Sequence, residues 1–255
     1  MKLFIINLEE QTHKRQLVQA QLTRLGLDAE FIPAVNGKAL PLNQLKTLAA
    51  DYDNSGLTAG EIGCALSHIA IYQKMIDEGI DQALILEDDV ILSGDLLAVL
   101  RAMDERNPTG PMAYLLTPPT HYNAAAPTMI WAGYKAYDFI GAWGTYGYII
   151  NQAAAKNLLD TLTPVFLEAD NWAYFQDAGL LKVKCIQPAL VHNNDVSGAN
   201  SSIASDRLPA QNKRKQYYQN VIKKNRPFNV RLKKALWNIF KKPFIKIVKP
   251  SNQPL

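Results

Sequence analysis

The sequence predicts an α/β fold with a mostly parallel central sheet, and the element order at the N-terminus is the main reason. Residues 2–8, KLFIINL, are an apolar run rich in branched side chains, which is typical of a buried strand. A helical pattern follows over residues 12–25 and stops at Gly26, and residues 28–35 form a second apolar run. A helix that connects two buried strands is the unit from which parallel sheets are built.

The rest of the body continues this alternation. Thr58 and Glu61 have the spacing of a capping box, which predicts a helix that runs to about Gly79. Asn151 is the expected N-cap of a helix that runs to residue 162. Further strands are expected at residues 82–87, 112–116, 144–150 and 181–192.

Composition is that of a globular protein, with 48% hydrophobic and 20% charged residues. The apolar run at the N-terminus is too short for a signal peptide, and no stretch approaches the roughly 20 apolar residues of a membrane span. Two cysteines do not make a disulfide framework. We therefore expect a cytoplasmic protein.

Charge is distributed unevenly along the chain. The segment 207–255 contains 14 Lys and Arg and no Asp or Glu, which leaves 13 basic and 23 acidic residues, a net charge of −10, in the first 206. We therefore expect a catalytic domain over 1–206 and a basic, partly amphipathic segment over 207–255.

Three carboxylates, Glu87, Asp88 and Asp89, directly follow the third predicted strand. Ligands of open α/β sheets bind at the carboxyl ends of strands. Alternation along a strand would place Glu87 and Asp89 on one side and Asp88 on the other. Two oxygen ligands suit a hard cation, Mn²⁺ or Mg²⁺, which leaves other coordination positions to substrate phosphates. The alternative is a solvated strand end.

The preceding helix carries Glu61 and His68 on one face, because seven residues are two helical turns. Glu61 is either a ligand or only a cap, and His68 is either a functional group or a hydrogen-bonded core histidine. Cys64 is expected to pack as a small apolar side chain rather than to form a nucleophilic pair with His68.

Four blocks appear in order: FIINLEEQTHKRQ, LTAGEIGCALSHIAIY, ALILEDDVIL and GTYGYIINQAAAKNLL, followed by SGANSSI. With them, residues 1–205 resemble glycosyltransferase family 25, the lipooligosaccharide galactosyltransferases of Gram-negative bacteria. The resemblance implies a GT-A fold with a Rossmann-like nucleotide half. It implies transfer of galactose from UDP-galactose to an outer sugar of lipooligosaccharide, with inversion to a β linkage. Glu87-Asp88-Asp89 stands for the family's DxD-like metal motif, with Asp89 as the first expected ligand and Glu87 as the second.

Such a reaction needs a base for the acceptor hydroxyl, and we expect it in residues 166–177, FLEADNWAYFQD. Asp170 is the first candidate, with a helix N-cap as its alternative role, and Glu168 is the second. Trp172 is expected to stack on the acceptor sugar, and Asp177 to be structural.

Donor binding is expected over the first two strands. The residues at their ends are Asn7, Leu8, Ala34, Val35 and Asn36. Glu61, His68 and Asp88 complete the expected donor-binding set. Arg15 either approaches the diphosphate or covers the helix surface.

His192, at the exit of the late strand, is the expected further metal ligand, with a plain loop histidine as the alternative. Residues 197–203, SGANSSI, are expected to close over the donor. Gly141 and Trp143-Gly144 are expected to form a bend rather than a donor contact.

The basic segment is expected to form a helix up to Lys242, ended by Pro243, with Trp237 and Phe240 on an apolar face. Such a helix fits an anionic membrane surface, which predicts a peripheral enzyme at the cytoplasmic face of the inner membrane. The alternatives are packing on the acidic body and nucleic-acid binding, and we expect no nucleic-acid partner because no binding module is recognisable.

Other functions compete with this one. A glucosyl- or N-acetylglucosaminyltransferase would share the same fold and motifs. A metal-dependent phosphoesterase would normally need a second set of ligands, and only one acidic cluster is evident. A non-catalytic sugar-nucleotide or membrane-binding module is the third alternative.

Overall fold

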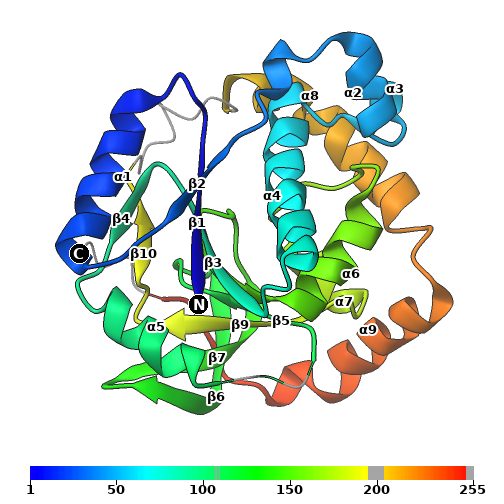
Figure 1. Ribbon diagram of the computed structural model, residues 1–255. Helices are drawn as coiled ribbons and strands as arrows, with labels where there is room; N and C mark the ends of the chain where they lie inside the picture. The colour runs from blue at the N-terminus through cyan, green and yellow to red at the C-terminus, as the bar shows by residue number, and fades with distance from the viewer. Residues whose placement is uncertain (107, 109, 195–203, 251–255) are drawn as a thin grey trace.

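The computed structural model describes residues 1–250 except 107, 109 and 195–203, and it is built around one central sheet (Figure 1). The strands of this sheet are β1 Lys2–Asn7, β2 Glu30–Pro33, β3 Gln82–Glu87, β5 Met112–Leu115, β6 His121–Trp131, β7 Tyr134–Gly141, β8 Gly147–Asn151, β9 Lys182–Gln187 and β11 Ile247–Val248. They lie in the order β11-β6-β7-β9-β5-β8-β3-β1-β2. A separate small sheet pairs β4 (Val90–Leu92) with β10 (Val191–Asn193).

Strand directions confirm the predicted fold class. Strands β1, β2, β3, β5, β6 and β9 run in one direction, and β7, β8 and β11 run against them. The sheet is therefore Rossmann-like and mostly parallel in orientation. β8 is inserted antiparallel between β3 and β5, which the sequence did not reveal because strand neighbours are chosen by long-range pairing.

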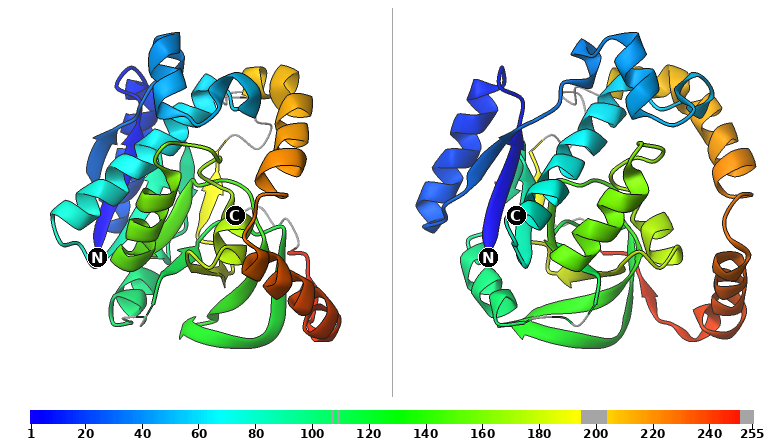
Figure 2. Two further views of the ribbon diagram at one scale, coloured as in Figure 1. Left: turned by 90° about the vertical axis from the view of Figure 1, so that its right-hand side faces the viewer. Right: turned by 45° about the vertical axis from the view of Figure 1, so that its right-hand side comes forward.

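Helices cover both faces of the sheet (Figures 1 and 2). They are α1 Thr12–Leu25, η1 Gly37–Ala39, α2 Leu42–Leu48, α3 Tyr52–Ser55, α4 Ala59–Asp77, α5 Leu96–Asp104, α6 Gln152–Leu162 and α7 Trp172–Asp177. Alternate residues of β1 enter two cores: Ile5 packs with α1 and α5, whereas Phe4 packs with α4 and α6. This alternation is what a strand buried on both faces requires.

Helix boundaries follow the predicted signals. α1 ends at Leu25, and Gly26 adopts the left-handed conformation (φ 64°) that favours glycine. α4 begins with the predicted capping box. The Glu61 N–H donates to the Thr58 hydroxyl oxygen, and the Thr58 N–H donates to the Glu61 carboxylate. Asn151 caps α6 by accepting from the Ala154 N–H. Local sequence therefore fixed these three helix ends.

Glycine allows one close approach that positions the site. A Cβ on Gly63 of α4 would lie 2.4 Å from the carbonyl oxygen of Val35, and one on Gly37 would lie 1.8 Å from that of Ala59. The loop after β2 therefore packs backbone to backbone on the first turns of α4. No larger residue fits at either glycine.

The C-terminal segment wraps along one side of the body (Figure 2). It forms α8 Ala204–Tyr217, a π-helical turn η2 Tyr218–Ile222, α9 Phe228–Phe240 and η3 Lys242–Phe244, and it ends as β11 on the edge of the central sheet. The predicted helix end before Pro243 is confirmed. The domain boundary at 206 stays a prediction, although segments on both sides of it share one sheet.

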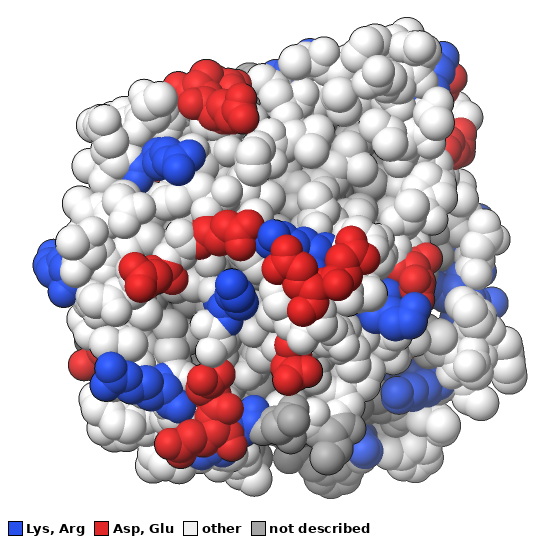
Figure 3. Space-filling view, in the orientation of Figure 1, with Lys and Arg blue, Asp and Glu red and all other residues white. Residues whose placement is uncertain are grey.

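Acidic residues of the body form ion pairs with basic residues of this segment. Packing on the acidic body was one of the alternatives predicted for it. Arg207 contacts Glu61, Arg214 contacts Glu168, and Lys234 contacts Asp177. Figure 3 shows acidic and basic groups interspersed on one face. Within the described residues, no helix is both long and apolar enough to cross a membrane.

Candidate functional site

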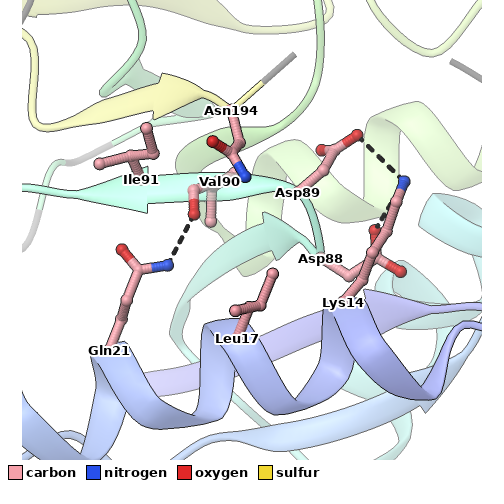
Figure 4. A pocket seen from close by; sticks show the side chains of 8 residues that line it. All are labelled: Lys14, Leu17, Gln21, Asp88, Asp89, Val90, Ile91 and Asn194. Atoms are coloured by element: carbon pink, nitrogen blue, oxygen red, sulfur yellow. Dashed lines mark hydrogen bonds and ion pairs between the residues drawn. The ribbon is translucent and has the colours of Figure 1, made fainter. Parts of the chain in front are cut away.

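The acidic cluster lies where β3 ends, as the sequence predicted. Glu87 is the last residue of β3, and Asp88 and Asp89 form the turn into β4. The backbone of this turn is held from two sides. Asn194 donates its N–H to the Asp89 carbonyl at 2.8 Å, and the Gln21 side chain of α1 bonds the Val90 carbonyl at 2.8 Å (Figure 4).

Asp88 and Asp89 turn toward the same cation, Lys14 of α1 (Figure 4). Lys14 Nζ lies 3.7 Å from Asp88 Oδ1 and 3.4 Å from Asp89 Oδ2. Asn7 donates to Asp88 Oδ2 at 2.6 Å. The predicted alternation, with Glu87 and Asp89 on one side, is wrong here because β3 ends at Glu87. Burial raises the pKa of both aspartates, and the charge of Glu87 adds to this rise.

A pocket of about 270 Å³ opens beside this pair. It lies between α1 and β4, at the turn that carries the two aspartates. Its lining residues are Lys14, Leu17, Gln21, Asp88, Asp89, Val90, Ile91 and Asn194 (Figure 4). The pocket therefore offers two carboxylates and one ammonium group next to an apolar wall.

Glu87 instead contacts α4 and the strand β8 region. Its Oε1 accepts from Thr145 Oγ1 at 2.7 Å and lies 3.7 Å from His68 Nε2. Burial alone would raise the pKa of Glu87, but contacts with His68 and Thr145 outweigh burial and lower it.

His68 is a hydrogen-bonded core histidine, the alternative that the sequence left open. It is 1% exposed, and its Nδ1 bonds the hydroxyl of Tyr148 at 2.8 Å. Its Nε2 is buried without a hydrogen-bond partner and faces Glu87. The prediction of a direct nucleotide contact is therefore wrong for His68, because no ligand reaches a side chain that is so deeply buried.

One group of three metal-capable side chains stands out in the described part of the chain. Ligand atoms of Cys64, His68 and Glu87 all lie within 4.8 Å of one another. The predicted set of Glu87, Asp89 and His192 is not such a group, and it stays a prediction. Burial strongly raises the pKa of the Cys64 thiol, so Cys64 is protonated, as expected of a packing residue.

Two orphaned atoms nevertheless point to a cation near Asp89. Asp89 Oδ1 and His192 Nε2 are both buried without a hydrogen-bond partner. His192 pairs with Ile91 across the small sheet, and Ile91 is two residues from Asp89. Asp89 directly precedes β4, and its carbonyl accepts from the Asn194 N–H at 2.8 Å, so Asp89 lies at the end of the small sheet that contains His192. A carboxylate oxygen and an imidazole nitrogen are suitable ligands for Mn²⁺, so these residues fit the predicted metal.

The loop before α7 brings Asp170 to the same region. Asp170 Oδ2 accepts from the Gly144 N–H at 2.8 Å, and Gly144 precedes Thr145, which holds Glu87. Burial raises the pKa of Asp170, and the charges of Glu168 and Glu87 raise it further. The N-cap of α7 is Asn171, so the capping alternative for Asp170 is wrong.

Glu168 is engaged elsewhere. Arg214 of α8 donates to both of its carboxylate oxygens, at 2.6 and 2.9 Å. Although burial raises the pKa of Glu168, this bidentate contact lowers it overall. A carboxylate held in this way is unsuited to take a proton, so the second-choice base is not supported by its contacts.

Trp172 cannot stack on a sugar, which corrects the prediction. It is 0% exposed, and its ring lies 5.0 Å from that of Tyr148 in the core. The reason is that α7 begins at Trp172 and turns this side chain inward. Asp177, by contrast, bonds Lys234 and Arg226 of the C-terminal segment, which fits its expected structural role.

The residues expected to bind the donor lie together at the ends of β1 and β2. The Ala34 N–H donates to the Asn7 carbonyl at 2.9 Å, and the Val35 N–H donates to Ser67 Oγ of α4 at 2.8 Å. Asn36 Nδ2 donates to Glu10 Oε1 at 3.0 Å. Because Asn7 also bonds Asp88, this edge adjoins the acidic cluster. Leu8, which follows Asn7, is partly exposed there.

Two members of the expected donor set have other roles. Arg15 stacks on the ring of Phe31 at 4.2 Å, so its contacts favour the surface-covering alternative. Glu61 is a cap: its Oε2 accepts from the Thr58 N–H and its Oε1 accepts from Arg207. With both oxygens engaged, Glu61 is not placed to bind a nucleotide.

Sequence reasoning missed Lys14, which lies in the cluster where Arg15 does not. A signal was available, because Lys14, Val18 and Leu22 are spaced by four and the last two are buried on the inner face of α1. Thr145 and Arg207 were also missed, and no local pattern marks them.

The predicted loop 197–203 lies outside the described residues. Gly144 has a φ of +85°, so the expected bend is confirmed.

Fold and site together define a class: an α/β protein with an acidic cluster at the carboxyl end of a strand of its central sheet, where ligands of such folds bind. Residues 1–124 match the model of glycosyltransferase family 25, described as an LPS biosynthesis protein. The resemblance to glycosyltransferase family 25 predicted from the sequence is therefore confirmed over these residues.

Curated relatives agree with this placement. A glycosyltransferase 25 family member of Aedes aegypti is 30% identical over 174 residues, which are 62% of this chain and 28% of the relative. Human procollagen galactosyltransferase 2 is 35% identical over 97 residues, 35% of this chain and 16% of the relative. The chain thus spans less than a third of either relative. A glycosyltransferase involved in glycosylating the major capsid of PBCV-1 superposes with a TM-score of 0.43 at 12% identity, over 83% of this chain and all of that one.

Proposed function

We propose that the chain is a metal-dependent glycosyltransferase that moves galactose from UDP-galactose to a terminal sugar of a lipooligosaccharide. The observation that carries the proposal is the acidic cluster after β3, with its orphaned Asp89 Oδ1, inside a family 25 sequence. Relatives named as procollagen galactosyltransferases support galactose as the donor sugar, and the description of the family as an LPS biosynthesis protein supports the acceptor.

Asp89 and His192 would hold the cation, with Glu87 as the third candidate. A bound Mn²⁺ or Mg²⁺ would supply positive charge to the diphosphate leaving group. Lys14 already lies between Asp88 and Asp89 and is placed to add a second positive charge at the same edge. The donor nucleotide would lie along the ends of β1 and β2, beside Asn7 and Asn36.

Asp170 is the proposed base. The acceptor hydroxyl oxygen would bond to the anomeric carbon, the bond from that carbon to the diphosphate oxygen would break, and the hydroxyl proton would pass to Asp170. Attack opposite the leaving group inverts the configuration and gives a β product. A raised pKa makes Asp170 a stronger base than an ordinary aspartate, and the Gly144 N–H fixes its direction.

UDP release tests this proposal. Wild-type protein would be supplied with UDP-galactose, UDP-glucose and UDP-N-acetylglucosamine, with Mn²⁺ or EDTA, and with lactose or N-acetylglucosamine as acceptor. We expect acceptor-stimulated release from UDP-galactose that EDTA abolishes. Release from another donor would change the sugar assignment, and absence of both release and UDP binding by calorimetry would contradict the proposal.

We further propose that α9 places the enzyme on an anionic membrane, where a lipid-linked acceptor is found. One side of α9 carries exposed apolar residues at helical spacing: Phe228, Leu232, Leu236 and Ile239, between 46% and 75% exposed. The opposite side packs on the body, where Lys234 bonds Asp177 and lies 4.9 Å from the ring of Trp237. Phe240 is 66% exposed and lies four residues after Leu236, so it extends this stripe, whereas Trp237 is half-buried beside Lys234. The predicted apolar face is therefore reproduced for Phe240 and not for Trp237.

Charge supports a lipid partner for this stripe. Arg231 and Lys233 lie in α9 next to this stripe, Lys241 and Lys242 follow the helix, and the sequence from 207 onward has no acidic residue. An apolar stripe bordered by cations fits the interface of an anionic bilayer.

Vesicle sedimentation tests the membrane surface. Wild type should sediment with vesicles that contain phosphatidylglycerol and not with pure phosphatidylcholine, and added salt should weaken binding. Leu232→Ser with Ile239→Ser should abolish sedimentation, whereas Lys224→Ser with Asn225→Ser, outside α9, should not. Equal sedimentation of both double variants would contradict the assignment of this stripe.

A further inference from the structure

Trp143 is a large apolar side chain that folding leaves in water. It is 74% exposed, whereas Trp172 is fully buried and Trp131 is 37% exposed. In the described part of the chain, the Trp143 ring stacks on no other aromatic ring or cation. An exposed indole beside a candidate site offers a large apolar face on which a ligand can pack.

The backbone around Trp143 is fixed to the proposed catalytic groups. Gly144 donates its N–H to Asp170 at 2.8 Å, and its carbonyl accepts from Trp172 Nε1 at 3.1 Å. Thr145 donates to Glu87 at 2.7 Å. Ala142, on the other side of Trp143, is buried.

The bend itself is also constrained. Gly144 has a φ of +85°, and a Cβ there would lie 2.6 Å from the ring of Tyr146. Side chains other than glycine are strained at this position. Trp143 is therefore carried by a short segment whose direction is set by contacts on both sides, and its ring projects outward from it.

We propose that Trp143 is the stacking platform for the acceptor saccharide, the role that the sequence assigned to Trp172. This inference rests on the proposed glycosyltransferase function. Trp143 directly precedes Gly144, whose N–H contacts the proposed base Asp170, so the indole is attached to the segment that borders this base. Apolar faces of sugar rings pack against aromatic faces, and the indole offers the largest such face.

A nucleobase would also stack on an indole, and its expected position argues against this occupant. The donor nucleotide is expected at the ends of β1 and β2, beside Asn7. Asn7 reaches the site through Asp88, whereas the Trp143 segment reaches it through Glu87 and Asp170. The two ligands therefore approach the acidic cluster through different residues.

The test compares Trp143→Ala with Trp143→Phe and with the control Trp131→Ala, which removes another partly exposed tryptophan. Acceptor KM would be measured at saturating UDP-galactose, with lactose and with the core oligosaccharide released from lipooligosaccharide. We expect Trp143→Ala to raise acceptor KM by roughly five- to tenfold and Trp143→Phe to stay within about twofold. The UDP Kd from calorimetry should be unchanged in all variants.

Three results separate the possibilities. An unchanged acceptor KM in an active Trp143→Ala variant would overturn the platform and leave the proposed function intact. A UDP Kd weakened by Trp143→Ala would overturn it in favour of a nucleobase platform. If wild type neither binds UDP nor transfers sugar, the proposed function fails first; binding of the core oligosaccharide to wild type but not to Trp143→Ala, followed by NMR, would then still support a saccharide site, and equal binding would overturn it.

Discussion

Glu168 and Asp170 lie two residues apart in one loop and meet opposite environments. Glu168 receives a bidentate contact from Arg214, which lowers its pKa. The pKa of Asp170 is raised by burial and by the charges of Glu168 and Glu87, and its hydrogen bond from the Gly144 N–H offsets only part of this rise. The fold thus pairs the charge of Glu168 with Arg214 and makes the ionised form of Asp170 unfavourable. Strain of this electrostatic kind is typical of functional groups, whereas paired acids are typical of structure.

The largest expected effect separates these two acids by activity. Asp170→Asn should lower transfer by roughly 10²- to 10⁴-fold, because the acceptor proton loses its base. UDP binding should be kept, since Asn can still accept from the Gly144 N–H. The matched variant Glu168→Gln, assayed as folded protein, should keep most of its activity. Equal loss of activity in both variants would contradict the different roles assigned to Asp170 and Glu168.

The effects on folding stability should have the reverse order, with Glu168→Gln more destabilising than Asp170→Asn. Removing one partner of the nearly buried Arg214–Glu168 pair should destabilise Glu168→Gln by about 3 kcal/mol, measured by urea unfolding. Because the pKa of Glu168 is lowered in the folded state, its contribution is present above the unfolded pKa and is lost as pH falls through the folded value. The gap between wild type and Glu168→Gln should therefore narrow in acid.

The contribution of Asp170 to folding stability has the opposite pH dependence. Its folded pKa is raised, so its favourable contribution is present below the unfolded pKa and is lost as pH rises through the folded value. At neutral pH the ionised group costs stability, and Asp170→Asn should unfold at a temperature equal to or above that of wild type. A clear fall in Tm would show that Asp170 is a structural acid like Glu168.

The pH dependence of kcat/KM sharpens the same comparison. The acid limb of wild type should lie above the pKa of an ordinary aspartate, because Asp170 must be ionised to accept a proton. Glu168→Gln should keep this limb but move it toward lower pH, because the charge of Glu168 contributes to the raised pKa of Asp170. Loss of the acid limb in Glu168→Gln would instead make Glu168 the group that takes the proton.

The smallest expected effect concerns Lys14. Its contacts with Asp88 and Asp89 are longer than 3.3 Å and its side chain is 28% exposed. Lys14→Gln should therefore change the free energy of unfolding by less than about 1 kcal/mol in urea titrations. A loss comparable to that of Glu168→Gln would mean that this cation holds the acidic cluster together.

Features set by neighbouring residues were predicted from the sequence. The helix of α1 with its stop at Gly26, the capping box at Thr58 and the cap at Asn151 are all local, and the structure reproduces them. The acidic cluster also lies where it was expected, because an apolar run followed by charge marks the end of a buried strand.

Features set by distant contacts were not predicted. Arg214 is 46 residues from Glu168, and Arg207 is 146 residues from Glu61, so no pattern in either segment announces the pair. The hairpin of β6 and β7 and the strand β11 were missed because their pairing partners decide them. The prediction for Trp172 failed for a related reason: burial depends on which way a helix turns, and the start of α7 faces the core.

Metal-dependent transfer at the acidic cluster is tested most directly by one comparison. UDP release from UDP-galactose would be followed for wild type and Asp89→Asn, with Mn²⁺ and with EDTA, alongside circular dichroism of both proteins. We expect acceptor-stimulated release that requires Mn²⁺ in wild type and falls at least about 100-fold in a folded Asp89→Asn variant. Full release by Asp89→Asn, or release by wild type that EDTA leaves unchanged, would contradict a metal held by Asp89.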